Sequence, residues 1–380
     1  MDELGSDVTD DTVELSTKMF QGCTKLTTFE GNMPKIKSAK EMFKTCPLLN
    51  SFKGNLDALT NATDMFNGTA LTTFEGNLGS LTKGEGMFNG CEKLEKFTGS
   101  VAKLTKGEGM FNGCKALYEV NASFGALTDG DNMFNGCGEL TKFSGNLPYL
   151  EEASNMFAGT KLESFEGTLD SLVTGAGMFN GCKTLTTFTG DMPNLTDASN
   201  MFAGTKLTSF AGNLDSLETG TGMFNQCPTL TTFNASLNSL QHATDMFAGT
   251  SLTSFSSSNL TNLTSAAGMF NGCAALTSFA ADLVSITSGR GMFNGCVALA
   301  TFTDCEGDGR VDMNKMTDGS GMFVGCNALT NFKANMPIME TADGMFVGCN
   351  ELEHFDAPMP KITDINKLFV EAVEGEGEQQ

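Results

Sequence analysis

Met87–Cys91, Met-Phe-Asn-Gly-Cys, is the stretch that decides the fold, because it returns almost unchanged along the whole chain. Met-Phe pairs begin at fifteen positions, and Leu368-Phe369 is a degenerate last copy. Neighbouring pairs lie 22 or 23 residues apart, except for a gap of 30 residues between Met292 and Met322. A fixed period of this length is typical of a solenoid, in which each repeat buries its apolar side against its neighbours.

A second pattern runs inside each repeat. Leu78 and Leu81 precede Met87 by nine and six residues, and a Gly or Ala stands three residues before the Met, as at Gly84. This spacing fits neither a long helix nor a long alternating strand. It favours a tight coil with one inward side chain per short straight segment. The segment Leu71–Phe74, Leu-Thr-Thr-Phe, is rich in strand-forming residues and predicts one short strand per coil.

These patterns predict a mainly β solenoid with one parallel sheet of short strands and little helix. Its predicted parts are an acidic lead at 1–12, about sixteen coils at 13–370 with an insertion at 304–310, and an acidic tail at 371–380. Some repeats carry Thr in the Cys slot and one residue fewer before the next Leu, and we expect the turn to absorb this deletion without loss of register. These residues are Thr69, Thr160, Thr205 and Thr250.

The repeat resembles the BspA-type leucine-rich repeat. The resemblance rests on a Leu-x-x-Phe strand, an apolar pair three residues apart, a small residue and an aromatic-Asn-Gly-Cys turn, and it covers roughly 13–369. This chain has Met-Phe where Ala-Phe is usual, and Gly-Asn-Leu where Ile-Pro is usual. The resemblance implies a right-handed, curved leucine-rich-repeat solenoid with a role in surface adhesion or protein binding. It implies no catalytic residues, and it suggests the cell surface or a virion as the location.

The net charge of −22 restricts the partners. An acidic surface repels phosphate backbones and anionic lipid, so we expect no nucleic acid partner and no membrane insertion. No run approaches the 18 apolar residues of a membrane span, and 1–15 is too acidic for a secretory signal. The chain as written is therefore expected in the cytoplasm, or as a piece of a secreted protein.

Eleven of the twelve cysteines occupy one slot, four residues after the repeat Met, as Cys91 does. Such a column predicts small buried residues in successive coils. Adjacent copies about 5 Å apart would be within bridging range, but parallel inward side chains seldom have the dihedral of a disulfide, so we predict free thiols. No Cys-x-x-Cys pair supports zinc. Cys305 lies outside the column and is the predicted reactive thiol.

In leucine-rich repeats the residues that flank the inward strand positions face the concave surface, which predicts a binding face here. Its candidate residues are Thr28, Glu30, Thr73, Glu75, Lys96, Lys142, Glu166, Thr187, Lys333, His354 and Asp356. Small hydroxyl residues dominate these columns, and the Trp, Tyr and Arg typical of tight protein interfaces are missing. The prediction is weak multivalent contact with protein or glycan. The alternative is that strand-forming residues simply fill an exposed sheet.

The insertion is the one irregularity of the array, and irregular loops often carry function. Oxygen ligands at alternate positions followed by Gly resemble a loop that wraps Ca²⁺. The candidate ligands are Asp304, Glu306, Asp308, the carbonyl of Arg310 and Asp312. Glu306 stands where Asp or Asn is usual, and Lys315 stands where a bidentate Glu would be. Calcium is thus the one cofactor that the sequence raises, with a solvated acidic loop as the alternative.

Enzymatic function is not predicted. His242 and His354 lie about five coils apart, and the chain has no nucleophile elbow, P-loop or His-Glu-x-x-His segment. A column of threonines raises ice or mineral binding, but Glu151 and Val173 interrupt it; its members include Thr60, Thr82, Thr105 and Thr128. We predict a recognition or adhesion scaffold. The alternative is a structural, self-associating component of a surface or virion assembly.

Overall fold

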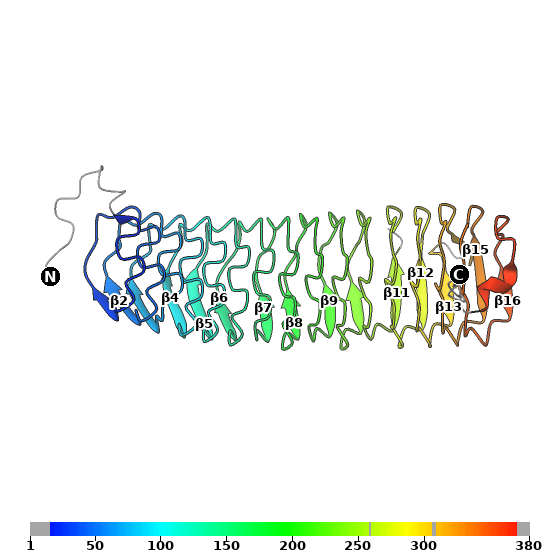
Figure 1. The fold of residues 1–380 in the computed structure, drawn as a ribbon. Helices are drawn as coiled ribbons and strands as arrows, with labels where there is room; N and C mark the ends of the chain where they lie inside the picture. Colours follow the sequence, from blue (N-terminus) through cyan, green and yellow to red (C-terminus); the bar gives the residue numbers. More distant parts are fainter. Residues whose placement is uncertain (1–15, 258–259, 306–308, 371–380) are drawn as a thin grey trace, which may run out of the picture. The chain divides into compact units, whose positions relative to one another are not determined.

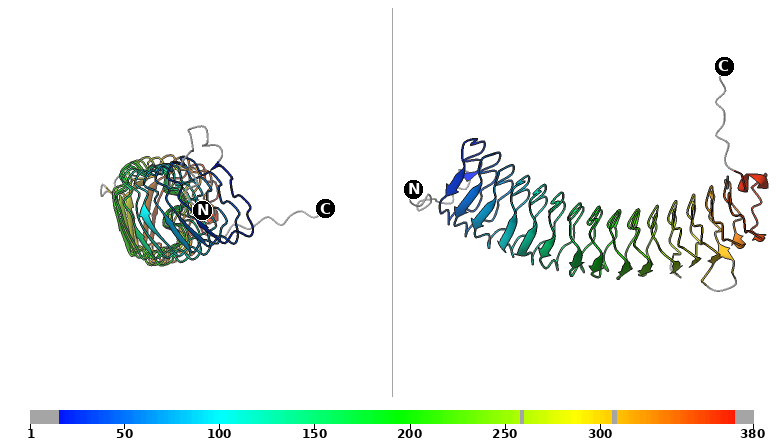
Figure 2. Two further views of the ribbon diagram at one scale, coloured as in Figure 1. Left: turned by 90° about the vertical axis from the view of Figure 1, so that its left-hand side faces the viewer. Right: turned by 90° about the horizontal axis from the view of Figure 1, so that it is seen from below.

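The computed structural model describes residues 16–257, 260–305 and 309–370 as short stacked coils (Figure 1). They divide into two units, unit 1 up to Leu195 and unit 2 from Thr196. The strands of each unit gather on one side of its stack (Figure 2). A solenoid of parallel strands with little helix is what the repeat predicts, and this prediction is confirmed. No helix among the described residues has the length and apolar character needed to cross a membrane.

Unit 1 has one strand per coil. Its strands are β1 (Thr28–Glu30), β2 (Ser51–Gly54), β3 (Thr73–Gly76), β4 (Lys96–Ser100), β5 (Glu119–Ser123), β6 (Lys142–Ser144), β7 (Ser164–Glu166) and β8 (Thr187–Thr189). All pairs are parallel and place equivalent residues opposite each other, as Phe29 lies opposite Phe52. The strands form three sheets, β1-β2-β3, β4-β5-β6 and β7-β8, rather than one continuous sheet.

Unit 2 repeats this plan. Its elements are β9 (Ser209–Ala211), β10 (Thr232–Asn234), β11 (Ser254–Ser257), β12 (Ser278–Ala281), β13 (Thr301–Thr303), β14 (Val311–Asp312), β15 (Asn331–Asn335), β16 (His354–Asp356) and the 3-10 helix η2 (Ile365–Leu368). Its sheets are β9-β10, β11-β12-β13 and β14-β15-β16. The insertion divides one strand into two: Phe302 of β13 stacks on Phe332 of β15, and Val311 of β14 pairs with Ala334 of the same strand.

The interior of each unit is a set of apolar files. Met87, Phe88, Cys91 and Leu81 are fully buried, and the same positions are buried in nearly every coil. Phenylalanines form two files, one from the Met-Phe turns and one from the strands. Successive rings of a file stack face to face, as Phe88 and Phe111 do at 5.3 Å. Rings of different files meet edge to face. Burial of this apolar surface is the main stabilising contribution.

The Met-Phe turns carry their own hydrogen-bonded ladder. The Phe66 amide donates to the Met87 carbonyl at 2.8 Å, and the Phe157 amide donates to the Met178 carbonyl at the same distance. This ladder continues through the coils that carry Thr69 and Thr160, so the turns keep their register as predicted. The strand ladder keeps its register across the Thr69 repeat, where β2 pairs with β3, but no pairing joins β6 to β7 across the Thr160 repeat. The sheets of unit 1 are interrupted between β3 and β4 and between β6 and β7. Strands β3 and β7 belong to the coils that carry Thr69 and Thr160.

The column of cysteines is confirmed as free and mostly buried. Each buried thiol donates to the carbonyl of a Phe in the preceding coil, as Cys137 Sγ does to Phe111 O at 3.1 Å. Burial raises the pKa of Cys91 to about 11 and that of Cys137 to about 12. Cys305 is exposed, as its place outside the column suggests. Partial burial and the nearby Asp282 raise its pKa as well.

The threonine column has a structural explanation. Thr82 Oγ1 donates to Thr60 O at 3.0 Å, and Thr105 Oγ1 donates to Thr82 O at 3.1 Å. The same contact recurs in unit 2, where Thr287 Oγ1 donates to Thr264 O at 2.9 Å. Because these hydroxyl groups bond neighbouring coils together, ice or mineral binding is not needed to explain the column.

Candidate binding face

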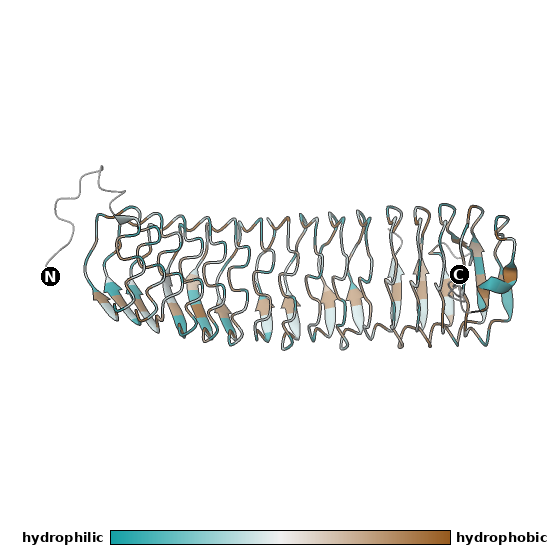
Figure 3. Ribbon diagram, viewed as in Figure 1, coloured by the Kyte–Doolittle hydropathy of each residue, from teal (hydrophilic) through white to brown (hydrophobic). Residues whose placement is uncertain are grey.

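All eleven candidate binding residues lie on strands with exposed side chains. Eight belong to unit 1 and three, Lys333, His354 and Asp356, belong to unit 2. We call the exposed residues that flank the inward strand positions the strand face. Successive residues of a strand point to opposite sides, so an inward Phe is followed by an outward polar residue, and the strands show both hydrophilic and hydrophobic colours (Figure 3). The candidates are thus exposed on the strands, while their part in ligand binding stays a prediction.

The prediction that this face is concave is wrong. In unit 1 neighbouring strand-side rings lie 5.5 to 6.5 Å apart, whereas turn-side rings lie 5.2 to 5.5 Å apart. In unit 2 the ranges are 5.5 to 6.3 Å and 5.3 to 5.6 Å. The coils are spread apart where the strands lie. The strand face is therefore on the outer side of the bend within each unit.

In unit 1 the strand face is charged with both signs. Lys96 pairs with Glu119 at 2.9 Å, and its ammonium lies 5.0 Å from the centre of the Tyr118 ring. Hydrogen bonds with Tyr118 and Glu119 raise the pKa of Lys96, and Lys96 lowers the pKa of Glu119. Lys53 lies 3.6 Å from Glu75. These side chains are half exposed or more in most cases, so the pairs contribute little to stability and remain accessible to a partner.

In unit 2 the strand face changes character. Strands β9 to β13 carry no charged residue at the flanking positions, which hold only Ser, Thr, Ala and Asn. Charge returns at Lys333 and Asp356. The two units therefore present different chemistry on equivalent strands, a contrast that the sequence columns already contain.

A cavity of about 890 Å³ lies at the interruption between β6 and β7. Residues of β5, β6, β7 and the segments that follow β6 and β7 line it, among them Asn121, Ser144 and Glu166. Glu166 was a candidate from the sequence, but the cavity itself was not predicted. The available signal was Thr160, which marks the shortened repeat that precedes β7.

The insertion is tied to the last two strands by Arg310. Its guanidinium forms an ion pair with Asp356 and donates to Ala334 O at 3.2 Å. Asp304 Oδ1 accepts from the Gly309 amide at 3.3 Å, and Asp312 Oδ1 accepts from Asn335. Glu306 and Asp308 lie outside the described residues. Calcium binding by this loop stays a prediction.

A second acidic group was not predicted from the sequence. Carboxylate oxygens of Asp129, Asp131 and Glu152 lie within 4.8 Å of one another on adjacent coils of unit 1. The spacing of Asp129 and Glu152 by one repeat is the signal that could have revealed it. Asp131 Oδ1 accepts from the Ser154 amide at 2.6 Å, which gives this carboxylate a structural role.

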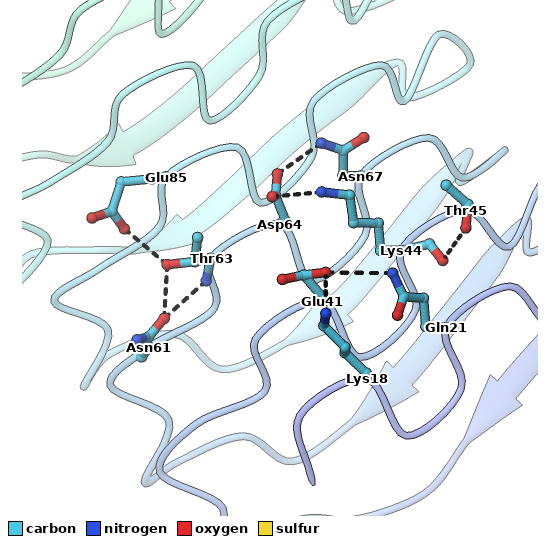
Figure 4. Close-up of polar contacts among 10 residues, drawn as sticks. All are labelled: Lys18, Gln21, Glu41, Lys44, Thr45, Asn61, Thr63, Asp64, Asn67 and Glu85. Carbon is cyan, nitrogen blue, oxygen red and sulfur yellow. Dashed lines mark hydrogen bonds and ion pairs between the residues drawn. The ribbon is translucent and has the colours of Figure 1, made fainter. Parts of the chain in front are cut away.

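Polar side chains also link neighbouring coils near the Met-Phe turns (Figure 4). Lys44 Nζ lies 2.8 Å from Asp64 Oδ2, and Asn67 Nδ2 donates to Asp64 Oδ1 at 2.7 Å. The hydrogen bond with Asp64 raises the pKa of Lys44. Thr63, next to Asp64, donates through Oγ1 to Glu85 of the following coil at 3.1 Å. These contacts hold coils together and leave the strand face free for other roles.

Short parallel strands, one per coil, with inward Leu, Phe and Met define a leucine-rich-repeat solenoid. The family described as BspA type leucine rich repeat region (6 copies) matches residues 7–94, 62–152, 153–277, 198–315 and 244–370. The chain belongs to this family. No curated protein matches the sequence.

A solved structure shows the same fold. A leucine-rich repeat protein from Bacteroides ovatus ATCC 8483 is 18% identical, with a TM-score of 0.53 over 72% of this chain and 77% of that one. A leucine rich cell surface protein from Faecalibacterium prausnitzii A2-165 is also 18% identical, with a TM-score of 0.37 over 86% of this chain and 83% of that one. At this identity the similarity concerns the fold alone.

Proposed function

We propose that the chain is a non-enzymatic recognition or adhesion scaffold, exposed at a cell surface or in a virion, that binds a protein or glycan through its strand face. The observation that carries the proposal is the register of the strands. Because Lys96, Glu119 and Lys142 lie opposite one another on β4, β5 and β6, exposed side chains recur at about 4.8 Å intervals. Repeated weak contacts with an extended ligand then add up to useful avidity.

The charge distribution favours unit 1 as the place where a protein would bind. A partner with alternating charges can exchange the weak pairs Lys53–Glu75 and Lys96–Glu119 for contacts of its own. Charged groups of this kind chiefly set specificity and the association rate. Two observations support a non-enzymatic role. The matched family is a repeat scaffold. The backbone bridges that join His242 to Ser265 and continue from coil to coil towards Thr341 do not bring His242 to His354 on β16.

A binding array of extracellular proteins and glycans tests the proposal. The wild-type chain is compared with Lys96→Ala/Glu119→Ala and with the control Lys361→Ala/Glu340→Ala, which removes an ion pair of 2.8 Å away from the strand face. We expect array ligands whose binding weakens in the first variant and not in the second. The absence of any ligand, or equal binding by both variants, would contradict the proposal.

Self-association is the second candidate function, because the first described coil of unit 1 and the last of unit 2 expose core positions. Phe20 and Phe29 of the first described coil are half-buried, whereas Phe43 and Phe52 of the next coil are fully buried. At the other end Phe369 is 47% exposed. Open ends of a repeat array favour stacking between chains. Light scattering across concentration distinguishes the candidates, since a strict monomer excludes assembly.

A further inference from the structure

The cavity between β6 and β7 is a built feature of the strand ladder. Among the backbone hydrogen bonds of the described chain, none joins 142–146 to 164–168. The Phe143 and Phe165 rings are 6.4 Å apart, whereas Phe165 and Phe188 of the next pair are 5.8 Å apart. Backbone amide and carbonyl groups that form a ladder elsewhere therefore face the cavity without a protein partner across the gap, and such groups require hydrogen bonds.

The walls of the cavity are polar and almost neutral. Asn121 and Ser123 come from β5, Ser144 and Asn146 from β6 and the residue stretch after it, and Ser164, Glu166 and Thr168 from β7 and its continuation. All seven side chains are exposed. Hydroxyl and amide groups both donate and accept hydrogen bonds, and an ionised carboxylate accepts only. One negative charge among seven polar side chains disfavours an anionic ligand.

The floor of the cavity is apolar. Phe143 lies there and is half-buried, in contrast to the turn-side phenylalanines, which are fully buried. Gly145 and Gly167 keep the approach to the rings open. A Cβ at Gly145 would lie 2.8 Å from Phe143 Cζ, so no side chain can cover the ring from that position. The exposed edge of an aromatic ring provides a flat apolar surface beside the polar walls.

We infer that this cavity binds a neutral saccharide. A pyranose has an apolar C–H face that can lie on Phe143 and a rim of hydroxyl groups that can both donate to Glu166 and exchange hydrogen bonds with Asn121 and Ser144. A cavity of about 890 Å³ lies within the usual size of small-molecule sites. A phosphate-bearing ligand would meet Glu166 and the net charge of −22. The inference rests on the proposed function: it specifies a glycan as the ligand and places it in this cavity.

Titration of the full chain with triacetylchitotriose and with maltotriose, followed by saturation-transfer NMR and calorimetry, tests the inference. We expect at least one of the two to bind with a dissociation constant below about 1 mM, a weak affinity of about −4 kcal/mol. Asn121→Ala and Glu166→Gln should each weaken binding by about threefold to tenfold, the usual effect of one lost hydrogen bond.

A space-filling variant provides the sharper comparison. Ser144→Trp places an indole in the cavity and should abolish binding, whereas Lys183→Trp, at an exposed turn position off the strand face and outside the cavity, should leave it unchanged. Circular dichroism checks that both variants fold. If Ser144→Trp does not fold, the effects of Asn121→Ala and Glu166→Gln on binding decide whether the cavity is the site. Absence of binding by both saccharides, or unchanged binding in the cavity variants, overturns the inference. If the array still identifies ligands whose binding depends on Lys96 and Glu119, the proposed function stands without the saccharide inference.

Discussion

Gly86 and Asp64 fit together across neighbouring coils: a Cβ added to Gly86 would lie 2.5 Å from Asp64 Oδ1. That oxygen is held by Asn67 at 2.7 Å, and the other oxygen of the carboxylate by Lys44 at 2.8 Å. The same relationship recurs where Asn155 precedes Gly177 by one repeat. A side-chain oxygen of one coil therefore occupies the space that a missing side chain leaves in the next.

Gly86→Ala should lower the free energy of unfolding by about 2–3 kcal/mol, because it combines a left-handed backbone with overpacking. Gly109→Ala is the matched control. Its φ of +58° is close to the +60° of Gly86, but the nearest atom to its added Cβ is 3.8 Å away, so only the backbone cost of about 1 kcal/mol should remain. Urea denaturation measures both. Equal losses would contradict the steric explanation, and Asp64→Gly should partly rescue Gly86→Ala.

Asp245→Asn should stabilise the chain at neutral pH. Burial raises the pKa of Asp245, so the folded state binds the proton more tightly than the unfolded state, and stability is lost as the pH rises through the window above the ordinary value of 3.8. The gain at pH 7 should be small, because the side chain is partly exposed and solvent screens it. Asn already occupies the equivalent place at Asn132 and Asn200.

Asp318→Asn is the control, because this change should lower the stability of the chain where Asp245→Asn raises it. Burial pushes the pKa of Asp318 upward, but hydrogen bonds from Ser320 and Thr341 outweigh it and hold the pKa below its ordinary value. This carboxylate therefore contributes stability above pH 3.8 that is lost as the pH falls through the lowered value. Denaturant midpoints at several pH values should show a gain for Asp245→Asn and a loss for Asp318→Asn. Effects of the same sign would refute the assignment.

Cys305 should be the fastest of the twelve thiols to react with a thiol reagent in the native chain, because it is exposed. Its raised pKa means that the thiolate, the reactive form, increases as the pH rises beyond 9. We expect one fast labelling phase that grows with pH and disappears in Cys305→Ser. Several fast phases at neutral pH would show that the column cysteines are accessible.

Phe111→Ala should cost about 3–5 kcal/mol, the usual range for truncation of a buried aromatic residue. Phe111 is fully buried and stacks at 5.3 Å on both Phe88 and Phe134. Phe369→Ala at the open end of the turn-side file of unit 2 should cost about 1 kcal/mol, because that ring is 47% exposed. Thermal and urea unfolding compare the two. A similar cost for both would mean that a fully buried turn-side ring stabilises the chain no more than a half-exposed one.

The repeat made most of the fold predictable. The spacing of Met87 from Leu81 and Cys91 is enough to place all three inward, and the structure buries them. The strand of the third coil begins at Thr73 rather than Leu71, since Leu71 points into the core before the ladder starts. The cysteine column is predictable for the same reason, because one slot per coil has one environment.

The curvature and the cavity were not predictable from the period. Loss of one residue beside Thr160 can be absorbed by the turns or by the strands, and the sequence does not say which. In the structure Phe157 keeps its hydrogen bond to Met178, and the strand ladder is interrupted instead. The cavity by Ser144 and Glu166 lies at this interruption, and the wider spacing of the strand-side rings makes the predicted concave face wrong.

The distance between spin labels on equivalent strands of unit 2 tests the solenoid most directly. Labels at Ser209 and Thr301, four strand steps apart, and at Ser209 and His354, six steps apart, are introduced in a Cys305→Ser background. At about 4.8 Å per step the account predicts about 20 Å for the first pair and about 30 Å for the second. Equal distances, or a shorter distance for Ser209 and His354, would contradict a stack of equal coils.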